Sequence, residues 1–184
     1  MAQFLFALLA TVIVGVGARD QLLVAHLGVR QGEGPYAARP AVLLLALVAA
    51  IGSAAAAAWA GATLAPLLVP HARTLLVALA LGLAALELLF VKPGRRPQEP
   101  TASLGAFAIV LLAYQMTDAA RLLAFVLTAS SRAPHAAAAG AMLGCAVMVA
   151  IGWLAGPSLL SWPLIGVRRG LGVLLGAAAI WLAV

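Results

Sequence analysis

An acid and a base stand three residues apart inside a long apolar run, and this pair is the clearest candidate for chemistry in the chain. The run extends from Leu104 to Ala129 and contains Gln115, Asp118 and Arg121. Residues three apart share one face of an α-helix, so the three polar side chains are predicted to form one stripe. Carboxylate and amide oxygens are the ligands that hard cations such as Ca²⁺ and Mn²⁺ prefer. A carboxylate at this depth is also a candidate proton carrier.

A second interpretation of the same stripe is purely structural. Arg121 can neutralise Asp118 one helical turn away, which would leave a tolerated polar patch with no role in transport. Thr117 adds a hydroxyl on the adjoining face of the helix. Ionisable groups within a membrane span are costly to bury and are usually functional or paired. The sequence leaves both interpretations open.

Another polar cluster lies in the first apolar run, with the sequence Gly15-Val16-Gly17-Ala18-Arg19-Asp20-Gln21. Gly15 and Gly17 are predicted to interrupt the helix and to expose backbone carbonyls, as in the broken helices of transporters. On a continuous helix Asp20 would lie about 200° around the axis from Ala18. We therefore expect Asp20 not to replace an acid at position 18.

The composition places these residues in a membrane protein. Hydrophobic residues make up 65% of the 184 residues and charged residues 9%, and the mean hydropathy is +1.13. Soluble domains are about 45–50% apolar and about 25% charged. The net charge of +6 does not indicate nucleic-acid binding, because most bases lie in short loops between apolar segments. The single cysteine, Cys145, excludes an internal disulfide and is expected to be a packing residue.

Six apolar segments approach the length of about 20 residues that a helix needs to cross a bilayer. We therefore predict an all-α integral membrane protein with six transmembrane helices. For the first segment a cleaved signal peptide is an alternative, although residues 1–18 contain no Lys or Arg. The six segments are Phe4–Leu27, Pro40–Leu68, Thr74–Val91, Leu104–Ala129, His135–Leu154 and Gly170–Val184. The last is short, and a start nearer Ile165 is its alternative.

The basic residues predict how the chain is oriented. Loops on one side of the six spans hold seven bases and loops on the other side hold two. Because cytoplasmic loops carry the excess of Lys and Arg, both termini are expected outside the cytoplasm, in an inner (plasma) membrane. The first group is Arg30, Arg39, Lys92, Arg95, Arg96, Arg168 and Arg169, and the second is Arg73 and Arg132.

The order of features suggests that the chain is a duplication. Residues 17–23 align with residues 117–123, a proline opens the next segment of each half, and a small-residue helix ending in glycine follows. The predicted units are residues 1–91, a basic cytoplasmic linker over 92–103, and residues 104–184. Two copies with three spans each must enter the membrane from opposite sides, which gives an inverted 3+3 repeat with its site near the midplane. Across that interface, Arg19 is a candidate partner for Asp118.

The remaining glycines and polar residues are predicted to have structural roles. Gly140 and Gly144 form a GxxxG spacing that lets helices approach closely. Glu87 is expected to face Lys92 or to extend toward the membrane surface. The three histidines do not form a metal-ligand spacing, and the sequence contains no phosphate-binding loop and no nucleophile–base motif.

At this point the chain resembles a known group, the six-helix calcium/manganese–proton exchangers, which belong to a wider superfamily that includes lysine exporters. These exchangers share a sequence motif, Glu-x-Gly-Asp-Lys/Arg-Ser/Thr, which occurs once in helix 1 and once in helix 4 and is usually followed by Gln-Leu. The first copy here keeps Gly17, Arg19, Gln21 and Leu22. Its Glu, Asp and Ser/Thr positions hold Gly15, Ala18 and Asp20.

The second copy keeps Asp118 and Leu122 of the same motif. Its Glu, Gly, basic and Gln positions hold Gln115, Thr117, Ala119 and Arg121. Asp118 is thus the one motif acid that remains of the four that the resemblance implies for the cation site. A divalent cation needs several oxygen ligands, so the resemblance supports the fold better than the activity.

The resemblance implies a divergent secondary transporter with an altered or lost metal site, in which Mn²⁺ or Ca²⁺ is a substrate rather than a cofactor and Asp118 with Gln115 is the candidate metal site. Because bases lie near this site, an anionic or zwitterionic solute is an alternative substrate. The bilayer is the expected partner. An alternative is a non-transporting paralogue that acts as a structural or partner subunit. A membrane-embedded enzyme is disfavoured, because the sequence places no second acid or nucleophile at the depth of Asp118.

Overall fold

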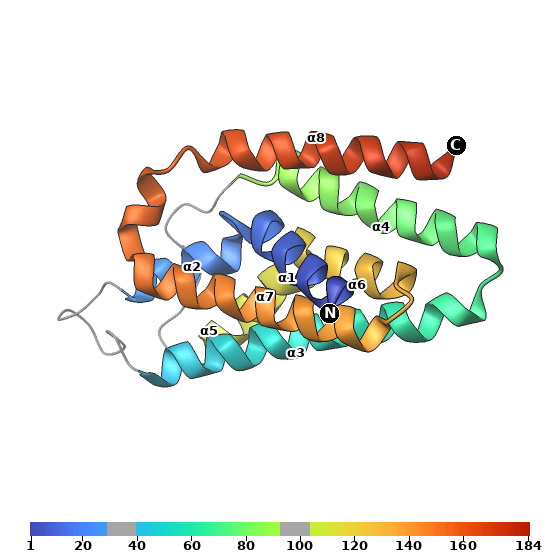
Figure 1. Ribbon diagram of the computed structural model, residues 1–184. Coiled ribbons are helices and arrows are strands. Elements are labelled where there is room, and N and C mark those ends of the chain that lie inside the picture. The colour runs from blue at the N-terminus through green and yellow to red at the C-terminus, as the bar shows by residue number, and fades with distance from the viewer. Residues whose placement is uncertain (29–39, 93–103) are drawn as a thin grey trace.

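A computed structural model describes residues 1–28, 40–92 and 104–184, and all regular elements in these ranges are helices (Figure 1). In chain order they are α1 (Ala2–Gly15), α2 (Arg19–Gly28), α3 (Pro40–Leu64), η1 (Ala65–Leu67), α4 (Pro70–Phe90), α5 (Leu104–Met116), α6 (Ala119–Ser130), α7 (Pro134–Ala155), η2 (Gly156–Ser161) and α8 (Leu164–Ala183). The predicted helical class is confirmed for these ranges. Residues 93–103 of the predicted linker, with Arg95 and Arg96, and the bases Arg30 and Arg39 lie outside the described residues.

Within the described ranges, four helices are long and apolar enough to cross a membrane: α3 together with η1, α4, α7 and α8. Their lengths are compatible with an integral membrane protein. Two boundaries differ from the prediction. Helix α4 begins at Pro70 rather than Thr74, and α8 begins at Leu164 rather than Gly170. The two shifts place Arg73 inside α4 and both Arg168 and Arg169 inside α8, so these three bases do not belong to loops.

The other two predicted spans are each a pair of helices joined at a break. α1 and α2 meet at 67°, and α5 and α6 meet at 53°. Gly17 lies in the first break with a φ of +72°, a backbone conformation that glycine adopts without steric cost. The second break falls at Thr117 and Asp118, so the single continuous helix expected over this region is wrong. With each pair counted as one span, the structure holds six candidate spans.

The two breaks are built alike. The Ala18 N–H donates to the Gly15 carbonyl at 3.1 Å, and the Asp118 N–H donates to the Gln115 carbonyl at 3.3 Å. These are the same positions in the two aligned motifs. A broken pair, a long helix that opens on proline, a short 3₁₀ turn and another long helix follow one another twice along the chain.

Helix pairing links the first half of the chain to the second. α1 and α2 pack on α7, α5 and α6 pack on α3, and α4 packs on α8. Small residues allow this closeness, because Gly140 lies against the Phe4 backbone and Gly144 against the Thr11 hydroxyl. Their predicted packing role is confirmed. Cys145 is 2% exposed within an apolar cluster, as expected for a packing residue.

Candidate functional site

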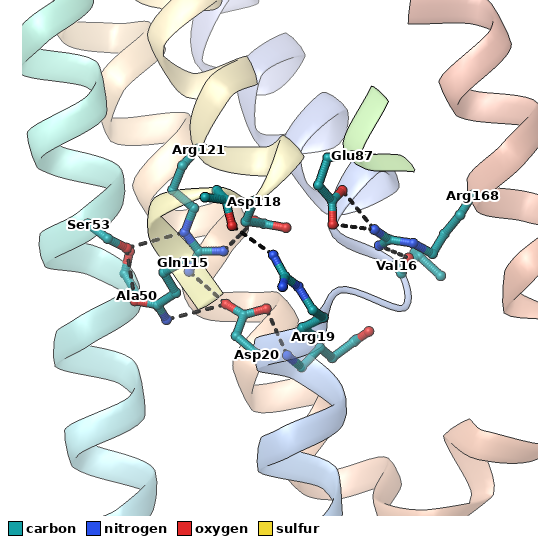
Figure 2. A network of polar contacts seen from close by, with 12 residues as sticks. Val16, Arg19, Asp20, Ala50, Ser53, Glu87, Gln115, Asp118, Arg121 and Arg168 are labelled. Atoms are coloured by element: carbon teal, nitrogen blue, oxygen red, sulfur yellow. Dashed lines mark hydrogen bonds and ion pairs between the residues drawn. The ribbon is translucent and has the colours of Figure 1, made fainter. Parts of the chain in front are cut away.

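The two helix breaks meet at a buried ionic cluster centred on Arg121, in the first turn of α6 (Figure 2). Arg121 Nη1 donates to Asp118 Oδ2 at 2.7 Å. Arg121 Nη2 lies 2.8 Å from Asp20 Oδ2, an ion pair at an angle outside that of a hydrogen bond. Asp20 and Asp118 are 4% and 3% exposed. One guanidinium therefore holds two carboxylates from the two halves of the chain.

Neutral polar groups complete the cluster on the side of α3. Ser53 Oγ accepts from Arg121 Nε at 3.2 Å and lies 3.1 Å from Gln115 Oε1. The Gln115 Nε2 donates to Asp20 Oδ2 at 3.3 Å. Gln115 is fully buried, and both ends of its amide form hydrogen bonds within the network, as is usual for a buried polar group. The predicted stripe of Gln115, Asp118 and Arg121 comes together, although the intervening backbone is not one helix.

Asp20 is the main correction to the sequence-based geometry. The expectation that Asp20 does not replace an acid at position 18 was drawn for one continuous helix through Gly17. Because the chain turns at Gly17, α2 starts in a new direction and its first turn brings Asp20 against Arg121. The expectation that no second acid lies at the depth of Asp118 is therefore wrong.

Both acids stand at the start of a half-helix. Asp118 is the N-cap residue of α6, yet its side chain makes no capping hydrogen bond. Asp20 lies in the first turn of α2, and its Oδ1 accepts from the Gln21 N–H at 2.8 Å. Helix N-termini carry a partial positive charge that favours anions. The ends of α2 and α6 thus help to keep two carboxylates in one buried site.

Asp118 retains one oxygen without a protein donor. Among the described residues its hydrogen bond runs from Arg121 to Oδ2, and no donor is found for Oδ1. Figure 2 shows the Asp118 carboxylate between Arg121 and the Glu87–Arg168 pair. This oxygen is the acceptor that a proton or a cation would meet in the cluster.

Arg19 joins the two halves in a way that differs from the expectation. Its Nη2 donates to the Thr117 hydroxyl at 2.7 Å, and its guanidinium lies 5.0 Å from the centre of the Tyr114 ring. Within the described part of the chain no ion pair connects Arg19 with Asp118. Its partner is therefore the residue beside Asp118, and Arg121 supplies the counter-charge.

Gln21 and the two glycines shape the first break rather than the ionic cluster. The Gly17 N–H donates to Gln21 Oε1 at 2.8 Å, and Gln21 Nε2 donates to the Met148 carbonyl at 3.3 Å. Gly15 ends α1 where a side chain would meet Met148. These contacts fix the turn that directs Asp20 inward.

A second buried ion pair lies beside the cluster and was missed by the sequence interpretation. Arg168 Nη2 lies 2.7 Å from both carboxylate oxygens of Glu87, and Arg168 Nη1 donates to the Val16 carbonyl at 3.5 Å. Glu87 thus faces α8 rather than Lys92. The shortness of the last predicted segment was the available signal, because extending it to about 20 residues includes Arg168.

The cluster is poor in metal ligands. The described residues contain no group of three or more His, Cys, Asp or Glu side chains arranged to hold a metal ion. Asp20, Asp118 and Arg121 together carry a formal charge of −1, and Glu87 with Arg168 carries none. The arrangement can bind or release a single positive charge at Asp118 if Arg121 keeps its place.

Comparison of the chain with protein-family models, with curated proteins and with solved structures gives no match.

Proposed function

We propose that this protein is a divergent secondary transporter whose substrate site lies where the breaks α1/α2 and α5/α6 meet. The observation that carries the proposal is the pair Asp20 and Asp118. Each acid begins a half-helix, each is buried, and both contact Arg121. Discontinuous helices whose half-helix ends face a buried polar site are a recurrent architecture of secondary transporters.

The charge of the site favours one class of substrate. The resemblance implies exchange of Mn²⁺ or Ca²⁺ for protons, and a hard divalent cation requires several oxygen ligands. Here Arg121 occupies Oδ2 of both acids. A proton, or a cation with one charge, is therefore the substrate that the altered site suits best, bound at Asp118 while Arg121 keeps its contacts with both acids.

The proposal is tested in proteoliposomes with a pH-sensitive dye inside and a panel of cations and small solutes outside. We expect a proton-coupled flux that Asp118→Asn abolishes and Asp20→Asn lowers strongly, because each substitution removes one of the two negative charges. Arg132→Gln is the matched control, since Arg132 is exposed in the turn after α6. Normal flux in Asp118→Asn would refute the proposal.

A non-transporting paralogue remains the second candidate, and one observation favours it. Arg121 already neutralises a carboxylate from each half, and the cluster is almost completely buried. Such a protein would give no flux with any solute of the panel, and deletion of its gene would leave metal tolerance unchanged. A measurable Mn²⁺- or Ca²⁺-dependent proton flux would exclude this alternative.

A further inference from the structure

A pocket of about 680 Å³ lies away from the ionic cluster, between α4, α6, α8 and η1. Its buried floor is apolar and includes Val77, Leu81 and Val126, whereas Pro66 and Pro70 at its rim are exposed. The volume falls within the range of about 300–1,000 Å³ that is typical of small-ligand sites. The pocket is thus large enough for a ligand and opens on the outer surface of the helical bundle.

Arg73 gives this pocket a single charged end. Its Nε donates to the Ala129 carbonyl at 2.7 Å, which fixes the guanidinium at the end of α6. Among the described residues no hydrogen bond or ion pair reaches its two Nη groups. The described lining residues include no acid. The charge is therefore available to an anion from outside the chain.

The pocket is charged at one end and apolar at the other, and this order along α4 matches that of a bilayer leaflet. Arg73, Val77 and Leu81 are four residues apart along α4 and line the same pocket, so it extends about 12 Å along the helix axis. Arg73 lies in the first turn of α4, at the end of a candidate span, and Leu81 lies toward its middle. An amphiphile with its head at the surface and its chain toward the bilayer centre would match this polarity.

We propose that this pocket binds one anionic phospholipid, with the phosphate on Arg73 and an acyl chain along Val77, Leu81 and Val126. The hydroxyls of Thr74 and Ser130 at the Arg73 end are committed as donors to helix carbonyls at 3.0 and 2.7 Å. The guanidinium is therefore the donor that selects the head group. Arginine suits this task because its planar fork matches phosphate oxygens.

The test is native mass spectrometry of the full-length protein, delipidated in detergent and titrated with phosphatidylglycerol or with phosphatidylcholine carrying the same acyl chains. We expect one bound phosphatidylglycerol, with an affinity about tenfold above that of phosphatidylcholine, because the choline cation of phosphatidylcholine would lie close to the Arg73 guanidinium and repel it. Arg73→Gln removes the preference and Arg73→Lys keeps part of it. Arg132→Gln is the matched control, because it removes an exposed charge near the same end of α6 that does not line the pocket.

A second variant separates binding from folding, since Arg73 also contacts the Ala129 carbonyl. Leu182→Trp narrows the pocket from α8 and leaves Arg73 intact, and it is expected to lower phosphatidylglycerol binding by about tenfold. Equal affinity for the two lipids would overturn the proposal. The proposal would also be overturned if Arg132→Gln lost as much phosphatidylglycerol affinity as Arg73→Gln. Competition by inorganic phosphate that is as strong as competition by the lipid would overturn it too.

Discussion

Arg121 determines the charge of the central site, because among the described residues it is the base that forms ion pairs with two acids. In a buried setting, removing one partner of an ion pair leaves an uncompensated charge, which costs more than the pair contributes. Asp118 and Asp20 both lie within 2.8 Å of this guanidinium. The positive charge of Arg121 is thus what allows both carboxylates to stay ionised inside the bundle.

Substituting Arg121 should therefore be the most destabilising change at the site. We expect Arg121→Gln to lower the free energy of unfolding by about 3–5 kcal/mol, because it leaves Asp20 and Asp118 facing each other without a cation. The double variant Arg121→Gln with Asp118→Asn should recover part of this loss. Unfolding in detergent, followed by helical circular dichroism, measures both, and an unchanged stability in Arg121→Gln would contradict the argument.

Whether a contact of the site can be predicted from the sequence depends on whether its residues are close together along the chain. The Asp118–Arg121 pair has a local spacing of three residues and was predicted. The contact of Asp20 was not, because a helical wheel fails once the helix breaks at Gly17. Glu87 and Arg168 are 81 residues apart, and local spacing carries no information about such a pair. Ser53 joins the network through packing of α3 against α6, which composition alone does not indicate.

At the scale of elements, small residues decide how closely the broken helices approach the long ones. A Cβ added to Gly144 would meet the Thr11 hydroxyl and lie 2.9 Å from the Leu8 carbonyl. The Leu8 carbonyl belongs to the backbone and Thr11 is fully buried, so the helices cannot relax by rotating an exposed side chain. The position of α1, and with it the first break, rests on this contact with α7.

Gly144→Ala should consequently destabilise the fold even though alanine favours helices. We expect a loss of about 1–3 kcal/mol, the usual cost of overpacking. Gly52→Ala in α3 is the matched control, because a Cβ there meets nothing within 4 Å, and it should stabilise by about 0.5–1 kcal/mol. Thermal unfolding in one detergent compares the two, and equal shifts in the same direction would argue against close α1–α7 packing.

At the scale of the whole molecule, we interpret the chain as a duplication, an interpretation that accounts for a site built from both halves. The breaks share a hydrogen bond at equivalent positions, and α4 packs on α8 while each broken pair packs on the long helix of the other half. In this interpretation the two halves differ at the position of the motif acid, where the first half has Ala18 and the second has Asp118. An inverted repeat is our interpretation of this order, and it requires each broken pair to cross the membrane.

That requirement can be tested with two single cysteines on a Cys145→Ala background. Lys92 and Arg132 are exposed, and they follow the ends of α4 and α6. These two helix ends lie at opposite ends of the bundle (Figure 1). Helix α8 contains Arg168 and Arg169, and α4 contains Arg73, so the two groups of loops hold five bases and one. The side of Lys92 is therefore still expected to be cytoplasmic. An impermeant maleimide added to intact cells should label Arg132→Cys and spare Lys92→Cys. The opposite pattern would reverse the orientation, and labelling of both would mean that α5/α6 enters and leaves the membrane on one side.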